Sequence, residues 1–253
     1  MKNSIQTERD GMKKYMIDTY MYENRTLVVL SFENVCKAEA MIKNDSKYGK
    51  ASDENAGRRG SYLGSTAYWF NQMKPLLDDL SIPSDDEKWK EVVKEVVCSI
   101  DRENSTHLNA DGVGRDEITK RIVSNKDDLI EMLKDKDNLE LFNLIQKETN
   151  PGDNKHHSRI NTSFASKFCH YACLYLFEGQ PEQDNYSIYD NVIREVLPLY
   201  AAKYGVEVEN LRDYVEYSRV IDAIRNAVSK ETGYELSRNG FDHLLWYFHK
   251  GRN

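Results

Sequence analysis

The sequence predicts a mainly α-helical fold. Three segments carry apolar residues at intervals of three and four positions, which places those residues on one face of a helix: residues 84–97, 125–147 and 164–177. Breaks rich in Gly, Pro, Asn and Asp separate the segments, and the strongest is Asn-Pro-Gly-Asp-Asn at residues 150–154. We therefore expect helices joined by polar turns.

The composition is that of a globular protein with room for one large domain or two small ones. The chain has 253 residues, of which 40% are hydrophobic and 30% are charged. Its formal net charge of −7 at pH 7 argues against an affinity for nucleic acid that is spread over the whole surface. A local basic patch is still allowed, because enzymes grip a short stretch of duplex with such patches.

Nothing in the sequence suggests export or a membrane. Residues 1–14 lack the apolar core of a signal peptide, and no apolar run approaches the ~20 residues that span a bilayer. The four cysteines form no CxxC pair and lack the spacing of a disulfide framework. We expect a reduced, cytoplasmic protein that does not bind membranes.

The first predicted region, residues 1–150, is mainly helical and carries no functional motif. Residues 26–32 form an apolar run that is too short to decide between a buried strand and a helix. An exposed loop is predicted over residues 51–64, and a short helix over residues 69–80.

Helix starts in this region are predicted from capping residues. Ser84, with Glu87 three residues later, predicts a capped helix start. Two further amphipathic helices are expected over residues 115–123 and 125–147, and Ser124 is the predicted cap of the second.

The second predicted region, residues 151–253, contains the most informative segment. A basic cluster at residues 155–159 comes first. The following apolar residues then repeat every four positions and predict a helix: Phe164, Phe168, Ala172 and Leu176. Lys167 lies in the first two turns of this helix, on a different face.

Asp190 follows Lys167 by 23 residues and is predicted to be the N-cap of the next helix, where backbone N–H groups hold its carboxylate. A helix from Lys167 to Phe177 rises only ~15 Å. The dozen residues after it span more than ~30 Å when extended, so the chain is long enough to bring Asp190 back beside Lys167.

Three motifs in this region resemble the helix–hairpin–helix DNA glycosylases, and specifically their 8-oxoguanine DNA glycosylase-like branch. Bacterial proteins with this fold carry a pattern similar to SFASKxxH, an IYD string and a D-x-x-LW helix. The matching residues here are 163–170, 188–190 and 242–246. The resemblance covers about residues 155–253, and the first 150 residues share only their helical character.

The resemblance implies a helical DNA glycosylase fold, with Lys167 and Asp190 at the catalytic positions. It also implies that the basic cluster and the backbone amides at the start of the lysine helix contact DNA phosphates. The residues implicated in DNA binding are Lys155, His157, Arg159, Asn161, Thr162 and Ser163. We expect a monomer that binds double-stranded DNA with a damaged or modified base.

The chemistry implied for this pair is base excision. The enzyme flips a nucleotide out of the stack, and positive charge develops on the sugar as the base departs. Asp190 would stabilise that charge or activate water or the amine. A neutral Lys167 would attack the sugar and form a Schiff base, whereas a protonated one would act electrostatically and leave a plain abasic site.

The segment departs from the family pattern at the hairpin. Ser163 and Ala165 stand where the family usually has a Gly-x-Gly core, so we describe the motif as degenerate. The four-cysteine signature of the iron–sulfur branch is absent, and Cys169 and Cys173 are two residues too few for a metal site of their own. We expect buried thiols, no metal and no cofactor.

Two substrates and one non-enzymatic role stay open. The branch implies 8-oxoguanine repair, with or without cleavage of the abasic site. The divergent first half favours instead a defence enzyme that removes hypermodified bases, such as glucosylated hydroxymethylcytosine, from phage DNA. The alternative from another class is a helical DNA- or protein-binding module without catalytic activity.

Overall fold

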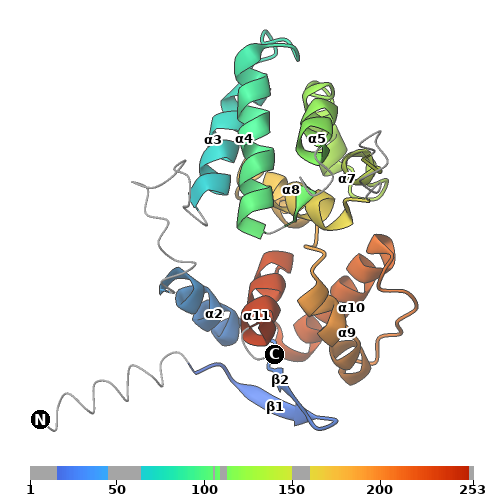
Figure 1. Cartoon of the computed structure of the whole chain (residues 1–253). Helices are drawn as coiled ribbons and strands as arrows, with labels where there is room; N and C mark the ends of the chain where they lie inside the picture. The colour runs from blue at the N-terminus through green and yellow to red at the C-terminus, as the bar shows by residue number, and fades with distance from the viewer. Residues whose placement is uncertain (1–15, 45–63, 105, 109–112, 150–159, 251–253) are drawn as a thin grey trace, which may run out of the picture. The chain divides into compact units, whose positions relative to one another are not determined.

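The computed structural model describes residues 16–44, 64–104, 106–108, 113–149 and 160–250. This part of the chain is mainly helical, as predicted, with a two-stranded antiparallel sheet and a 3-10 helix (Figure 1). Its elements run in this order: β1 (Thr19–Tyr22), β2 (Arg25–Val28), α2 (Phe32–Asn44), α3 (Gly64–Asp78), α4 (Glu87–Asn104), α5 (Gly114–Val123), α6 (Leu129–Lys134), α7 (Glu140–Gln146), α8 (Thr162–Leu176), η3 (Pro181–Asp184), α9 (Asn191–Lys203), α10 (Tyr214–Thr232) and α11 (Arg238–Lys250). None of the described helices has both the length and the apolar character needed to cross a membrane.

The described residues form two compact units. The first unit joins the residues up to Asn44 with those from Tyr189 onward, and the second runs from Gly64 to Ile188. The division into residues 1–150 and 151–253 followed the strongest break in the sequence. The two compact units do not follow that division, because the N-terminal hairpin and α2 pack with the C-terminal helices.

The apolar run at residues 26–32 divides into the end of a strand and the start of a helix. β2 pairs antiparallel with β1, and Tyr22 lies opposite Arg25. The turn therefore contains only Glu23 and Asn24, whose φ angles are 46° and 63°. Two consecutive left-handed residues are typical of the hairpin turn whose twist matches that of the flanking strands.

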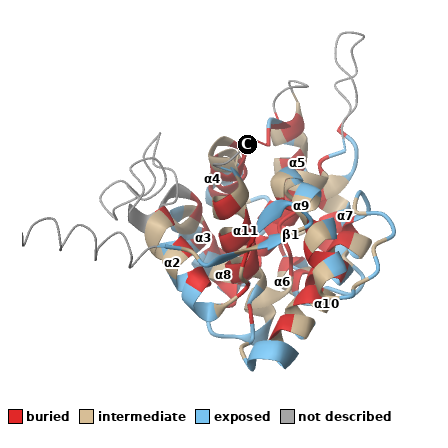
Figure 2. Ribbon diagram, turned by 90° about the horizontal axis from the view of Figure 1, so that it is seen from below, coloured by how far each residue is buried: buried red, intermediate tan, exposed pale blue. Residues whose placement is uncertain are grey.

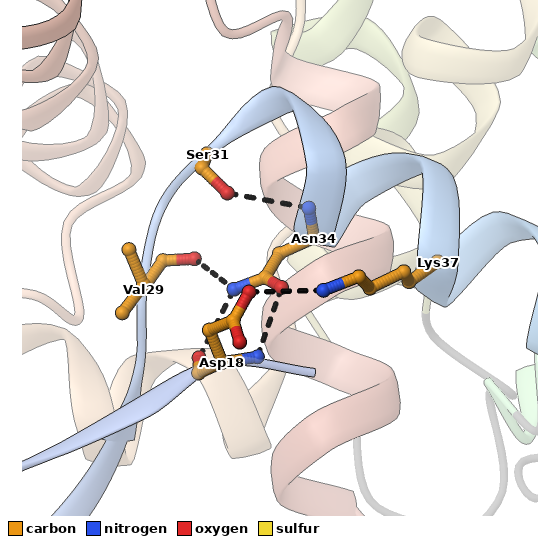
Figure 3. Close-up of polar contacts among 5 residues, drawn as sticks. All are labelled: Asp18, Val29, Ser31, Asn34 and Lys37. Carbon is orange, nitrogen blue, oxygen red and sulfur yellow. Dashed lines mark hydrogen bonds and ion pairs between the residues drawn. The ribbon is translucent and has the colours of Figure 1, made fainter. Parts of the chain in front are cut away.

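The buried amide of Asn34 fastens α2 to the hairpin (Figure 3). Its Nδ2 donates to the carbonyl oxygens of Val29, at 2.8 Å, and Asp18, at 3.0 Å, while its Oδ1 accepts from the Asp18 N–H at 2.9 Å. Ser31 Oγ accepts from the Asn34 N–H at 3.2 Å. Lys37 adds an ion pair of 2.9 Å to the exposed carboxylate of Asp18. One side chain thus satisfies three backbone groups where the hairpin ends.

Helix α11 is the centre of the first unit, where it packs against α2, α9 and β2. The approach of α2 depends on Gly240, since a Cβ there would lie 3.1 Å from Val35 Cγ1. Tyr200 joins the remaining elements: its hydroxyl accepts from the Val28 N–H at 2.9 Å and lies 3.2 Å from His249 Nε2.

Helix α8 is the centre of the second unit and packs against α3, α4, α6, α7 and η3. Most of its ribbon is coloured as buried in Figure 2. The predicted apolar stripe is confirmed, because all four of its residues are buried: Phe164, Phe168, Ala172 and Leu176. Neighbours on several sides bury residues on the other faces of this helix as well.

The helix predicted over residues 125–147 is wrong, because the chain forms the two short helices α6 and α7 there. Ser124, its predicted N-cap, is instead the C-cap of α5. Between α6 and α7, Asp135 Oδ2 accepts from Asn138 Nδ2 at 2.6 Å, and Leu139 has a φ of 52°. Short polar side chains that bond locally compete with the helix, and a left-handed residue interrupts it.

Two other predicted boundaries shift. Helix α3 begins at Gly64 rather than at Trp69, and residues 51–63 of the predicted loop lie outside the described residues. The start of α4 is capped by Asp86 rather than by Ser84, since Asp86 Oδ1 accepts from the Trp89 N–H at 3.0 Å. Asp86 directly precedes the first residue of α4, which is the position from which a side chain caps the helix.

Candidate active-site residues

The start of α8 carries the described part of the predicted DNA contacts. Asn161 is the N-cap residue and is buried, and its Nδ2 lies 3.5 Å from Thr149 Oγ1. Thr162 Oγ1 lies 3.5 Å from Gln146 Oε1 at the end of α7. The backbone of this turn is also held to α7, because the Asn161 N–H donates to the Gln146 carbonyl at 3.1 Å. The predicted contacts Lys155, His157 and Arg159 lie outside the described residues.

Lys167 lies in the second turn of α8 and is only 6% exposed. Its Nζ donates to Ser163 Oγ at 3.2 Å. The amine therefore reaches toward the N-terminal end of its own helix, the direction in which helical side chains lean. Most lysines in globular proteins are exposed to solvent, whereas Lys167 is buried.

His170, the last residue of the SFASKxxH motif, has a structural contact. It is buried, and its Nδ1 lies 2.8 Å from the carbonyl oxygen of Tyr186. A carbonyl can only accept, so Nδ1 carries the proton and donates. Tyr186 in turn donates its hydroxyl to the Met132 carbonyl at 3.4 Å. The motif thus ties α8 to the segment that leads, four residues later, to Asp190.

Asp190 is the N-cap of α9, as predicted. Its backbone is extended, and its Oδ1 accepts from the Val192 N–H at 2.8 Å. This bond fixes the carboxylate at the positive end of a helix, where a negative charge is favoured. Because Asp190 is only half-buried, the group stays in reach of solvent.

A buried tyrosine, Tyr217, lies near both Asp190 and a second carboxylate within the first unit. Tyr217 is fully buried, and burial raises its pKa. The carboxylate of Asp242 raises that pKa further, while a hydrogen bond with the backbone of Asp190 lowers it and the Asp190 charge raises it. Asp242 itself is 8% exposed and belongs to the D-x-x-LW motif of α11. Sequence spacing did not connect Tyr217 with Asp190, since the two residues are 27 positions apart.

Aromatic packing holds the residue before Asp190. The rings of Tyr189 and Tyr217 meet edge-on with centroids 5.0 Å apart, and Tyr214 stacks on Tyr217 at 6.5 Å. The Arg194 guanidinium lies 5.3 Å from the Tyr189 ring centre and donates to the Tyr189 hydroxyl. Since Tyr189, Tyr214 and Tyr217 are all buried, they support the Asp190 backbone as core residues.

The cysteines of α8 are buried thiols, as predicted. Cys169 and Cys173 are both fully buried, and burial raises the pKa of Cys169 well above its ordinary value. A thiol held in its neutral form is a poor nucleophile and a poor metal ligand. Among the described residues, no three His, Cys, Asp or Glu side chains gather closely enough to hold a metal ion.

The two predicted catalytic residues belong to different compact units. Lys167 is part of the second unit. The first unit resumes at Tyr189, so Asp190 is part of the first unit. Comparisons with protein-family models, with curated proteins and with solved structures each found no match.

Proposed function

We propose that this protein is a DNA glycosylase of the helix–hairpin–helix type, which flips a damaged or modified base out of double-stranded DNA and excises it. One observation carries the proposal: the lysine and the aspartate of the catalytic motifs fall on a buried amine and on a helix-capping carboxylate. Lys167 is buried in the second turn of α8 and Asp190 caps the next α-helix, which suits an amine nucleophile and a charge-stabilising carboxylate.

Asp190 has the firmer role in this proposal. Positive charge on the sugar must be stabilised whether or not a covalent bond forms, and a carboxylate held by a backbone N–H does so without rearranging. The same group can accept a proton from an attacking water. We propose that Asp190 stabilises the oxocarbenium-like transition state.

The role of Lys167 determines whether excision proceeds through a Schiff base or by direct attack of water. If its nitrogen bonds to the sugar, the enzyme passes through a Schiff base and can cleave the abasic site. If it stays a cation, it acts on the departing base and water completes the reaction. We propose that DNA phosphates bind at the start of α8, through the backbone amides there and the preceding basic cluster.

The proposal is tested by incubating the purified protein with three duplexes that carry unmodified bases, 8-oxoguanine, or glucosylated hydroxymethylcytosine. Abasic sites are then counted. We expect abasic sites on one of the two modified duplexes, and we expect Asp190→Asn to lower their rate of formation at least about 100-fold. The matched control is Asp213→Asn, which makes the same change at the N-cap of α10 in the same unit.

Each outcome of this experiment has a clear meaning. Excision of 8-oxoguanine indicates a repair enzyme, and excision of the glucosylated base indicates a defence enzyme. No abasic sites on any duplex, or an Asp190→Asn variant as active as the wild type, contradicts the glycosylase and favours a non-catalytic binding module.

A further inference from the structure

Ser163 and Lys167 form a contact on the face of α8 that carries the proposed amine. They are four residues apart in one helix, so their side chains lie on the same face one turn from each other. Lys167 Nζ donates to Ser163 Oγ at 3.2 Å. Lys167 is buried, while Ser163 is half-buried.

A hydroxyl is a suitable acceptor for an amine that must react. It carries no charge, so it can accept from a neutral amine, and it favours the ammonium ion far less than a carboxylate does. A carboxylate in the same place would instead hold the nitrogen in its unreactive, charged form. When one N–H donates to Ser163 Oγ, rotation about the Cε–Nζ bond is restricted. The nitrogen lone pair is then limited to fewer orientations.

Resting on the glycosylase proposal, we infer that Ser163 is a positioning residue that orients the Lys167 amine for attack on the sugar, and that it is not a phosphate ligand. In the attack, the Nζ lone pair bonds to C1′ and the C1′–N bond breaks with its electron pair on the base. A proton from the nitrogen passes to the departing base. The nitrogen lone pair then forms the C1′=N bond as the C1′–O4′ bond breaks, and O4′ takes up a proton from water, which gives the protonated Schiff base.

The local structure explains why a serine can stand at this hairpin position. The Ser163 hydroxyl is directed to the amine, while its carbonyl accepts from Ser166 Oγ at 2.9 Å. A glycine would leave room for phosphate but would offer the amine no acceptor. The neighbouring hydroxyl of Thr162 lies instead by Gln146, which makes Thr162 the matched residue without this role.

The test combines borohydride trapping with DNA binding. We expect Ser163→Ala to lower the rate of trapping at saturating DNA roughly 10- to 100-fold, with little change in the dissociation constant. Ser163→Thr keeps the hydroxyl and should restore trapping. Thr162→Ala should weaken DNA binding instead, with trapping at saturating DNA retained. If Ser163→Ala weakens binding and leaves trapping at saturating DNA unchanged, the inference is overturned.

A readout without DNA separates this inference from the function on which it rests. The hydrogen bond to Ser163 Oγ slows exchange of the Lys167 Nζ protons with water, and we expect NMR to show faster exchange in Ser163→Ala. An unchanged exchange rate in that variant contradicts the positioning role. Wild-type protein that excises a base but forms no trapped adduct also overturns the inference, whereas wild-type protein that excises no base overturns the proposed function.

Discussion

At Asp190 a single side chain has two roles, because it caps α9 and carries the charge of the proposed chemistry. The two roles respond differently to substitution. Asparagine keeps a side-chain oxygen for the Val192 N–H and loses the charge, whereas alanine loses both.

We therefore predict that Asp190→Asn leaves the free energy of unfolding almost unchanged, while Asp190→Ala lowers it by about 1 kcal/mol. Both should lower the rate of excision at least about 100-fold. Asp213 is the matched cap, since its Oδ1 accepts from the Glu216 N–H at 3.0 Å. Asp213→Ala should cost a similar amount of stability and leave excision intact. Urea unfolding and abasic-site counting measure the two effects, and a stable Asp190→Ala variant would contradict the capping role.

Single residues were predicted from the sequence where the interaction is local. The Asp190 cap needs only its own helix, and its position before an apolar period predicted it. Lys167 is buried in a helix that packs against several distant elements, so no pattern in its own segment could predict that burial. The link between Asp190 and Tyr217 joins residues far apart in the chain and was missed for the same reason.

At the scale of elements, the hairpin and α2 depend on Asn34 more than on their ion pair. Asn34 is fully buried and binds three backbone groups, whereas Asp18 of the ion pair is exposed. Breaking a buried, satisfied amide leaves those groups without a partner and costs more than losing a solvated charge pair.

We expect Asn34→Ala to lower the free energy of unfolding by roughly 2–4 kcal/mol. Lys37→Met removes the ion pair and should cost at most about 1 kcal/mol. Chemical denaturation of the two variants compares them directly. Equal losses in both would show that the amide does not anchor the hairpin.

Periodicity predicted the long elements well and the short ones poorly. Helices α8 and α9 follow from apolar residues at a helical interval. The 125–147 segment has the same interval, yet Asp135 and Asn138 bond to each other and Leu139 adopts a left-handed backbone. The spacing of apolar residues does not show whether polar side chains form local hydrogen bonds that compete with the helix.

At the scale of the whole molecule, the chain leaves its first unit after α2 and returns to it at Tyr189. Tyr200 joins the first and last parts of that unit, since its hydroxyl accepts from the Val28 N–H and lies beside His249. Removal of the hydroxyl would leave a buried N–H unsatisfied.

We predict that Tyr200→Phe destabilises the first unit by about 1–3 kcal/mol. In hydrogen exchange followed by mass spectrometry, peptides from the hairpin, α9 and α11 should exchange faster, and peptides from α4 to α8 should change less. Tyr204→Phe, a half-buried tyrosine at the end of the same helix, is the control and should change little. An equal change in both units would contradict this expectation.

The sequence by itself determined the helical class, the main helices around Lys167 and Asp190, and the cap at Asp190, because each follows from residues that are neighbours in the chain. Only the tertiary structure decided that Lys167 is buried and bonded to Ser163, that Tyr217 lies near both Asp190 and Asp242, and that the N-terminal hairpin belongs with α9 and α11. Those features arise from contacts between segments far apart in the chain, and a local apolar period carries no information about which distant segment will cover it.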